Sequence, residues 1–82
     1  MKYALRLLQN RTNYYLTYST ESGQKIAMFY NKDKIDRRIK YGDIIPILFP
    51  TKLIARLAMK RHKYHQKYDG TFTIVLWENV SD

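Results

Sequence analysis

The sequence predicts a small α+β fold, in which a mainly antiparallel sheet of three or four strands is covered by one long and one short helix. Apolar and polar residues alternate across much of residues 2–30 and again over 71–80, a period of two that is typical of strands. Residues 51–68 instead carry apolar side chains at the three- and four-residue spacing of a helix. Because 82 residues provide for one core only, residues 1–82 are predicted to form a single domain.

The N-terminal third is predicted to be a meander of three antiparallel strands, over residues 2–8, 14–19 and 25–30. The polar stretch 10–13 suits the first turn, and the stretch 21–24 contains a glycine for the second. Tyrosine and threonine are frequent in the second strand, which favours extended backbone. Each of these strands is therefore expected to pair with its neighbour along the chain.

The second strand has two faces of unequal apolar area. The larger set is Tyr14, Leu16 and Tyr18, and the smaller is Tyr15, Thr17 and Ser19. The larger set is predicted to face the helices, because burial of apolar area favours it. The ring of Tyr15 would then be exposed on the opposite face of the sheet.

A short helix is predicted over about residues 31–40. Asn31 or Asp33 can cap its first turn, and Ile35 and Ile39 lie four residues apart, which places them on one face. Most of the remaining positions are charged. This charged side is expected to lie in solvent.

The apolar segment 44–49 contains Pro46, which cannot donate a hydrogen bond to a sheet. It is predicted to be an edge strand or a buried extended connection, with the connection favoured. Residues 51–68 then predict one long helix, which ends at residues 69–70. The side chains of this helix expected to face the core are Leu53, Leu57, Tyr64 and Tyr68, with Ile54 and Arg61 beside them. The last strand, within 71–80, completes the sheet.

The strongest functional signal is positive charge. Fifteen lysines and arginines stand against seven acidic residues, which gives a net charge of +8 and a pI near 9.8. On the long helix, five cations recur every three or four residues and lie within about a quarter of the circumference. They are Lys52, Arg56, Lys60, Lys63 and Lys67. No acidic residue lies between Lys52 and Tyr68 to offset their repulsion, so an anionic partner is expected to do so.

These observations predict a basic, non-enzymatic nucleic-acid-binding protein that contacts the phosphate backbone through the cationic helix face, with DNA and RNA both open. Arg37, Arg38 and Lys40 are expected to form an adjoining basic patch, and Tyr15 to stack on unpaired bases. The alternative is a small protein-interaction module or inhibitor that binds an acidic surface of a larger protein. A homo-oligomer that pairs through an edge strand or a tyrosine-rich face is a third alternative.

Enzymatic chemistry is not expected from the residues present. The chain has two glutamates, and it contains neither a Ser-His-Asp order nor a glycine-rich phosphate loop. It has no cysteine, which excludes disulfides and thiolate metal sites. His62, His65 and Asp69 share one side of the long helix, but the surrounding cations would repel a divalent metal. The sequence therefore predicts no catalytic site, no metal and no cofactor.

The location of the protein is predicted from the length of its apolar segments and from its N-terminal sequence. No stretch approaches the roughly 18 consecutive apolar residues that a membrane span needs, and the N-terminus lacks the pattern of a secretory signal. A cytoplasmic protein with no membrane partner is expected.

Overall fold

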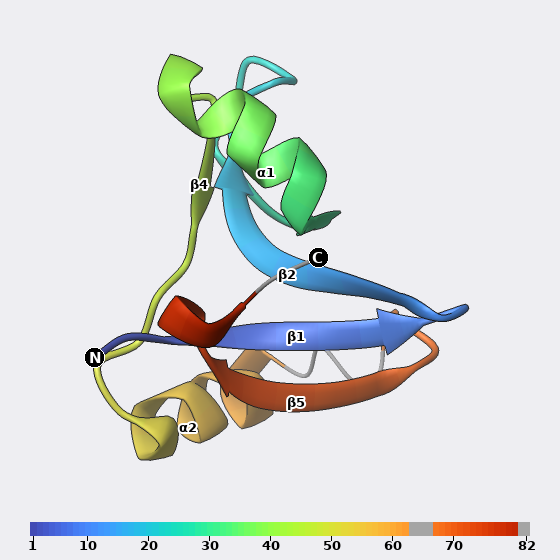
Figure 1. Ribbon diagram of the computed structural model, residues 1–82, viewed down its shortest axis with the longest axis vertical. Coiled ribbons are helices and arrows are strands. Elements are labelled where there is room, and N and C mark those ends of the chain that lie inside the picture. Colours follow the sequence, from blue (N-terminus) through green and yellow to red (C-terminus); the bar gives the residue numbers. More distant parts are fainter. Residues whose placement is uncertain (63–66, 81–82) are drawn as a thin grey trace.

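The strands and helices are described by a computed structural model over residues 1–62 and 67–80 (Figure 1). In these residues, five antiparallel strands form one sheet, and two α-helices and two short 3-10 turns accompany it. The strands are β1 (Tyr3–Gln9), β2 (Thr12–Ser19), β3 (Ile26–Asn31), β4 (Ile44–Pro46) and β5 (Thr71–Leu76). The helices are α1 (Lys32–Arg38) and α2 (Lys52–His62), and the 3-10 turns are η1 (Ile39–Tyr41) and η2 (Trp77–Asn79). The predicted α+β class is confirmed, with one strand more than expected.

The main sheet has the order β3-β2-β1-β5. The predicted meander is confirmed, and the turn between β1 and β2 is made by Asn10 and Arg11, both with positive φ. Two such residues match the right-handed twist of a hairpin. The C-terminal strand β5 pairs with β1, so that Arg6 lies between Tyr15 of β2 and Thr73 of β5.

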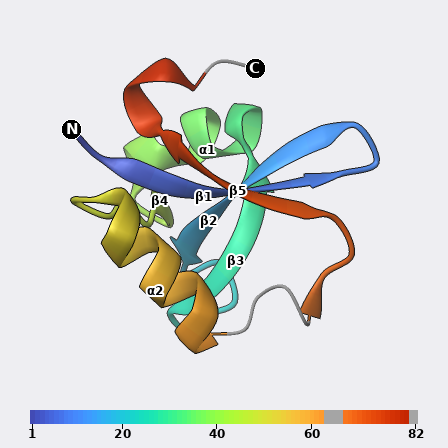
Figure 2. The ribbon, with the colours of Figure 1, turned by 90° about the horizontal axis from the view of Figure 1, so that it is seen from below.

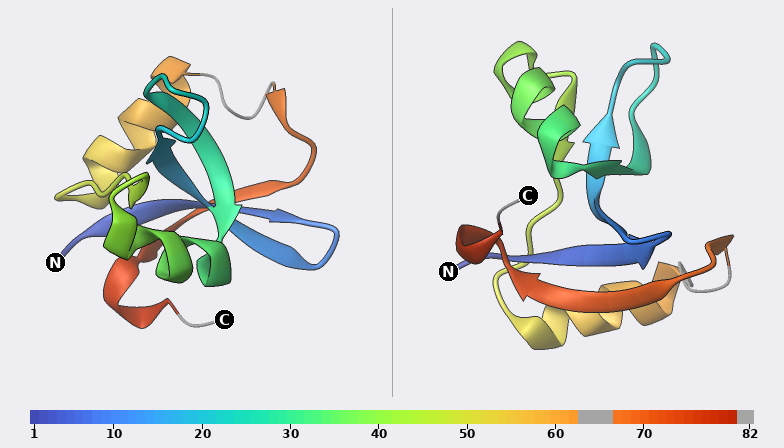
Figure 3. Two further views of the ribbon diagram at one scale, coloured as in Figure 1. Left: turned by 90° about the horizontal axis from the view of Figure 1, so that it is seen from above. Right: turned by 45° about the vertical axis from the view of Figure 1, so that its right-hand side comes forward.

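The segment that contains Pro46 fills a gap where β1 and β2 diverge. β2 pairs with β1 at its start and with β4 at Thr17–Ser19. Farther along, the Ile47 amide donates to the Leu16 carbonyl at 3.0 Å, and Phe49 exchanges two backbone hydrogen bonds with Tyr3. Figure 3 shows β2 curving away from β1 toward α1. The alternative prediction of an edge strand is therefore confirmed for Ile44–Pro46, and the favoured prediction of a buried extended connection is wrong there.

The core has two parts, one on each face of the sheet. Successive residues of β1 belong to different parts. Ala4 packs with Tyr15 and Ile35, whereas Leu5 packs with Leu16 and Ala55. α1 covers the first part and α2 covers the second, and Figure 2 shows the two helices on opposite sides of the strands. Covering both faces lets a small sheet bury consecutive residues of a strand.

The predicted inner face of β2 is confirmed for Leu16, which is buried beneath α2, but the predicted exposure of the opposite face is wrong. Tyr15 is only 2% exposed and meets the ring of Trp77 edge to face, with 5.6 Å between centroids. Thr17 is also buried, and its hydroxyl donates to the Met28 carbonyl at 2.8 Å. Tyr18, by contrast, is 41% exposed. Comparing apolar area between the two faces failed because both faces are covered.

The predicted core-facing side of α2 is also wrong. Ala55 is the fully buried residue among those of this helix whose burial is described, whereas Leu53 and Leu57 are 64% and 57% exposed. Of the other stripe residues, Tyr68 packs against Phe29, and Tyr64 lies outside the described residues. A small side chain at the contact allows a helix to approach the sheet closely. Ala55 therefore sets the rotation of α2.

The contrast between one long and one short helix also needs correction. α2 is described over eleven residues, Lys52–His62, and the expected helix 51–68 continues across residues 63–66, which lie outside the described residues. α1 is extended by η1, so the two together cover 32–41. Asn31 caps α1 as predicted, since its side chain accepts a hydrogen bond from the Lys34 amide at 2.8 Å.

Candidate binding surfaces

Helix α2 presents a cationic arc to solvent. Lys52, Arg56 and Lys60 are all exposed, and in the part of the chain that the structure describes none of them pairs with a carboxylate. Lys67, farther along, is exposed as well, and Lys63 lies outside the described residues. Because the spacing keeps these cations on one side of the helix, they are available together to an anionic partner.

A hollow of about 340 Å³ lies between this arc and the edge strand β5. Its lining residues are Lys52, Arg56, Met59, Phe72, Thr73 and Ile74. Two cations thus border a depression with an apolar floor. The outer edge of β5 lies beside it, because β5 ends the order of the main sheet.

Next to the cationic arc, α2 exposes an apolar stripe that consists of Leu53, Ile54 and Leu57. Ile54 is 44% exposed, and with Leu57, Ala58 and Arg61 it lines a shallow hollow of about 210 Å³. Thr51 holds the start of the helix, since its hydroxyl accepts a hydrogen bond from the Ile54 amide at 3.1 Å. Grouped exposed aliphatic side chains mark interaction sites more often than isolated ones do. The sequence revealed this stripe but assigned it to the core.

The predicted basic patch on α1 and η1 does not adjoin the cations of α2, contrary to the prediction. Arg37 pairs with Asp33 at 3.2 Å, Arg38 pairs with Asp43, and Lys40 is exposed. Because α1 and α2 cover opposite faces of the sheet, these charges cannot extend the arc on α2. Their ion pairs also reduce the charge that they offer to a partner.

The Arg38–Asp43 pair makes a testable contribution to stability. The hydrogen bond from Arg38 lowers the pKa of Asp43 below its ordinary value. The stabilisation is therefore present above the ordinary carboxyl pKa and is lost as the pH falls through the lowered one. In thermal melts, Asp43→Asn is expected to melt below the wild type at neutral pH, with a difference that shrinks in acid. Asp33→Asn, at an exposed pair, is the control, and a difference for Asp43→Asn that stays constant with pH would contradict this role.

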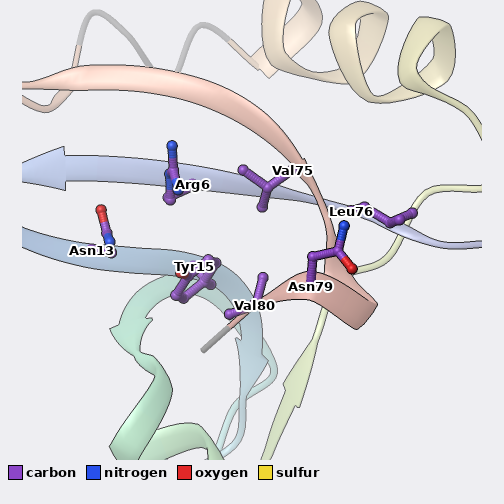
Figure 4. Close-up of a pocket in the computed structure, with 7 residues that line it drawn as sticks. All are labelled: Arg6, Asn13, Tyr15, Val75, Leu76, Asn79 and Val80. Atoms are coloured by element: carbon purple, nitrogen blue, oxygen red, sulfur yellow. The ribbon is translucent and has the colours of Figure 1, made fainter. Parts of the chain in front are cut away.

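A separate pocket of about 370 Å³ opens on the other face of the sheet (Figure 4). Its lining residues are Arg6, Asn13, Tyr15, Val75, Leu76, Asn79 and Val80. Sequence reasoning missed it, because it joins β1, β2, β5 and η2. The available signal was Arg6, a charged residue within an apolar strand.

Comparison with protein-family models, with curated proteins and with solved structures finds no match to this chain. Among the described residues, no helix is both long and apolar enough to span a membrane. Nor do those residues contain a cluster of three side chains suited to hold a metal ion, and His65 lies outside them.

Proposed function

We propose that this protein is a non-enzymatic interaction module whose helix α2 docks onto an acidic, partly apolar surface of a larger protein. The observation that carries the proposal is the exposure of Leu53, Ile54 and Leu57 beside cations that pair with no carboxylate among the described residues. Removing apolar surface from water contributes about 25 cal/mol per Å², so a partner that covers these side chains gains affinity. Phosphates alone would leave the stripe in water.

Charge complementarity supports an acidic partner. Lys52, Arg56 and Lys60 lie on one side of the stripe, and Arg61 is also exposed on the same helix. A second copy of the chain would bring the same cations together, where like charges repel. An amphipathic acidic segment would instead cover the aliphatic side chains and pair with the cations. The net charge of +8 would speed its association.

The proposal is tested with a synthetic amphipathic peptide that carries leucines at helical spacing and flanking glutamates. Leu57→Ser is expected to weaken peptide binding at least about tenfold, because the apolar contact is lost. Its melting temperature should change little, since Leu57 is 57% exposed. Fluorescence titration of the labelled peptide measures the affinity, and a peptide of scrambled sequence measures charge attraction alone.

The matched control is Ile45→Ser. Ile45 is 51% exposed on β4 and has no part in α2, so its replacement should leave the affinity for the peptide unchanged. Equal affinities for the Leu57→Ser and Ile45→Ser proteins would contradict docking through the stripe. Binding of the scrambled peptide as tightly as the amphipathic one would do so too.

Nucleic-acid binding is the second candidate, and the exposed cations of α2 favour it. Lys52, Arg56 and Lys60 would contact phosphates, with Lys63 and Lys67 continuing the series. Base stacking on Tyr15 is no longer part of this proposal, because that ring is buried. The contacts would be independent of base sequence and common to DNA and RNA.

Salt dependence separates the two candidates. If phosphates bind, replacing Lys52, Arg56 and Lys60 together by Gln should reduce the log-log salt slope of oligonucleotide affinity by about 0.7–0.9 per contact. Leu57→Ser should leave oligonucleotide affinity unchanged. Titrations against single- and double-stranded oligonucleotides at two salt concentrations measure both effects. A wild-type slope in the triple variant would exclude α2 as the phosphate-binding surface.

A further inference from the structure

The pocket around Arg6 lies on the opposite face of the sheet from α2 and has no part in the docking proposed above. It opens beside η2, where Asn79 and the following residue, Val80, line one side. Figure 4 shows Asn13, Arg6 and Val75 on neighbouring strands across its floor. The pocket volume, about 370 Å³, is at the lower end of the range for small-molecule sites.

Arg6 is the cation of this pocket. It lies on the central strand β1, is only partly exposed, and donates from Nε to the Thr73 hydroxyl at 3.0 Å. Among the described residues no carboxylate pairs with it. A guanidinium held by Nε still has the donors of its two Nη atoms, and their planar fork matches a carboxylate.

The other residues that line the pocket indicate the chemistry of the rest of the ligand. Val75, Leu76 and Val80 supply apolar surface, and Asn13 and Asn79 supply amide groups. Arg6 is the one charged residue that lines the described pocket, which suits a monoanion better than a doubly charged phosphate. The small volume limits the ligand to a compact molecule.

We propose that this pocket binds the carboxylate of a small organic acid, with Arg6 as its anion anchor. The apolar part of the acid lies against the valines, and the asparagine amides orient its polar edge. Thr73 positions the guanidinium through its hydrogen bond to Nε. This small-molecule site is separate from the surface of α2 that we propose binds a protein partner.

Amide chemical shifts of the ¹⁵N-labelled protein test the site, with benzoate and butanoate as probes. Benzoate is expected to shift the amides of Arg6, Asn13 and Asn79 and to saturate at about millimolar concentration. Benzamide has the same shape without the charge and should bind at least about tenfold more weakly. Equal shifts with benzoate and benzamide would overturn the proposal. Binding of inorganic phosphate more tightly than benzoate would overturn the carboxylate assignment.

Variants of the anchor provide an independent readout. Arg6→Lys keeps the charge but loses the planar fork, and it should weaken benzoate binding at least about tenfold. Arg11→Gln, in the exposed hairpin turn, is the control for loss of a positive charge and should bind as the wild type does. Wild-type affinity in Arg6→Lys and Arg6→Met would overturn the role of Arg6. The comparison of benzoate with benzamide uses the wild-type protein, so it tests the proposal even if a variant is unstable.

Discussion

Replacing Tyr15 by alanine is expected to destabilise the fold by about 3–5 kcal/mol, the usual range for removing a buried aromatic side chain. The ring is 2% exposed and belongs to the core cluster beneath α1. Its edge-to-face contact with Trp77 would be lost together with the buried area. Unfolding in urea measures the change in free energy.

Leu57→Ala is the control for this prediction, because Leu57 was expected in the core but is 57% exposed. Its free energy of unfolding should change by no more than about 0.5 kcal/mol. A stable Tyr15→Ala protein together with an unstable Leu57→Ala protein would reverse the assignment of both surfaces. It would restore the exposed ring on which base stacking depended.

Replacing Gly70 by alanine is the second substitution with a large expected cost. Gly70 has a φ of +140°, and an added Cβ would lie 2.5 Å from the Leu8 carbonyl oxygen and 2.8 Å from Leu7 Cδ1. The backbone conformation costs about 1–3 kcal/mol for a residue other than glycine, and the clash adds a comparable amount. Thermal melts should show a large decrease in melting temperature.

Gly23→Ala separates the two contributions of that cost. Gly23 also has a positive φ, of +87°, but nothing lies within 4 Å of an added Cβ. Its replacement should therefore show the conformational cost alone. If Gly70→Ala lowers the melting temperature no more than Gly23→Ala does, the close approach of residue 70 to β1 is not as described.

The elements that the sequence predicted well are those determined by local chemistry. A period of two identified β1 and β2, a polar turn located the hairpin, and Asn31 marked the start of α1. Asn10 and Arg11 adopt the positive φ that such a turn requires. None of these features depends on which residues pack against which face.

The features that were mispredicted depend on tertiary packing. Alternation in β2 shows that Tyr15 and Leu16 point to opposite faces, but it does not show that both faces are covered. The helical spacing of Leu53 and Leu57 is equally typical of a core stripe and of a docking stripe. Ala55, which settles the rotation of α2, gives little signal because its apolar area is small.

The site around Arg6 could not be predicted for a topological reason. Its lining comes from residues 6–15 and 75–80, which meet because β5 returns to pair with β1. Sequence spacing carries no information on that pairing. The cations of α2, by contrast, could be grouped from the sequence because they share one helix.

Thiol labelling of single-cysteine variants tests the central claim, that α2 turns its apolar stripe toward a partner, most directly. The natural chain has no cysteine, so Leu57→Cys and Ala55→Cys each introduce one reporter. With a maleimide reagent, Leu57→Cys is expected to react at nearly the rate of a free thiol, and Ala55→Cys at least about tenfold more slowly. Saturating acidic amphipathic peptide should slow the reaction of Leu57→Cys by a similar factor. Rapid labelling of Ala55→Cys, or a rate for Leu57→Cys that the bound peptide leaves unchanged, would contradict it.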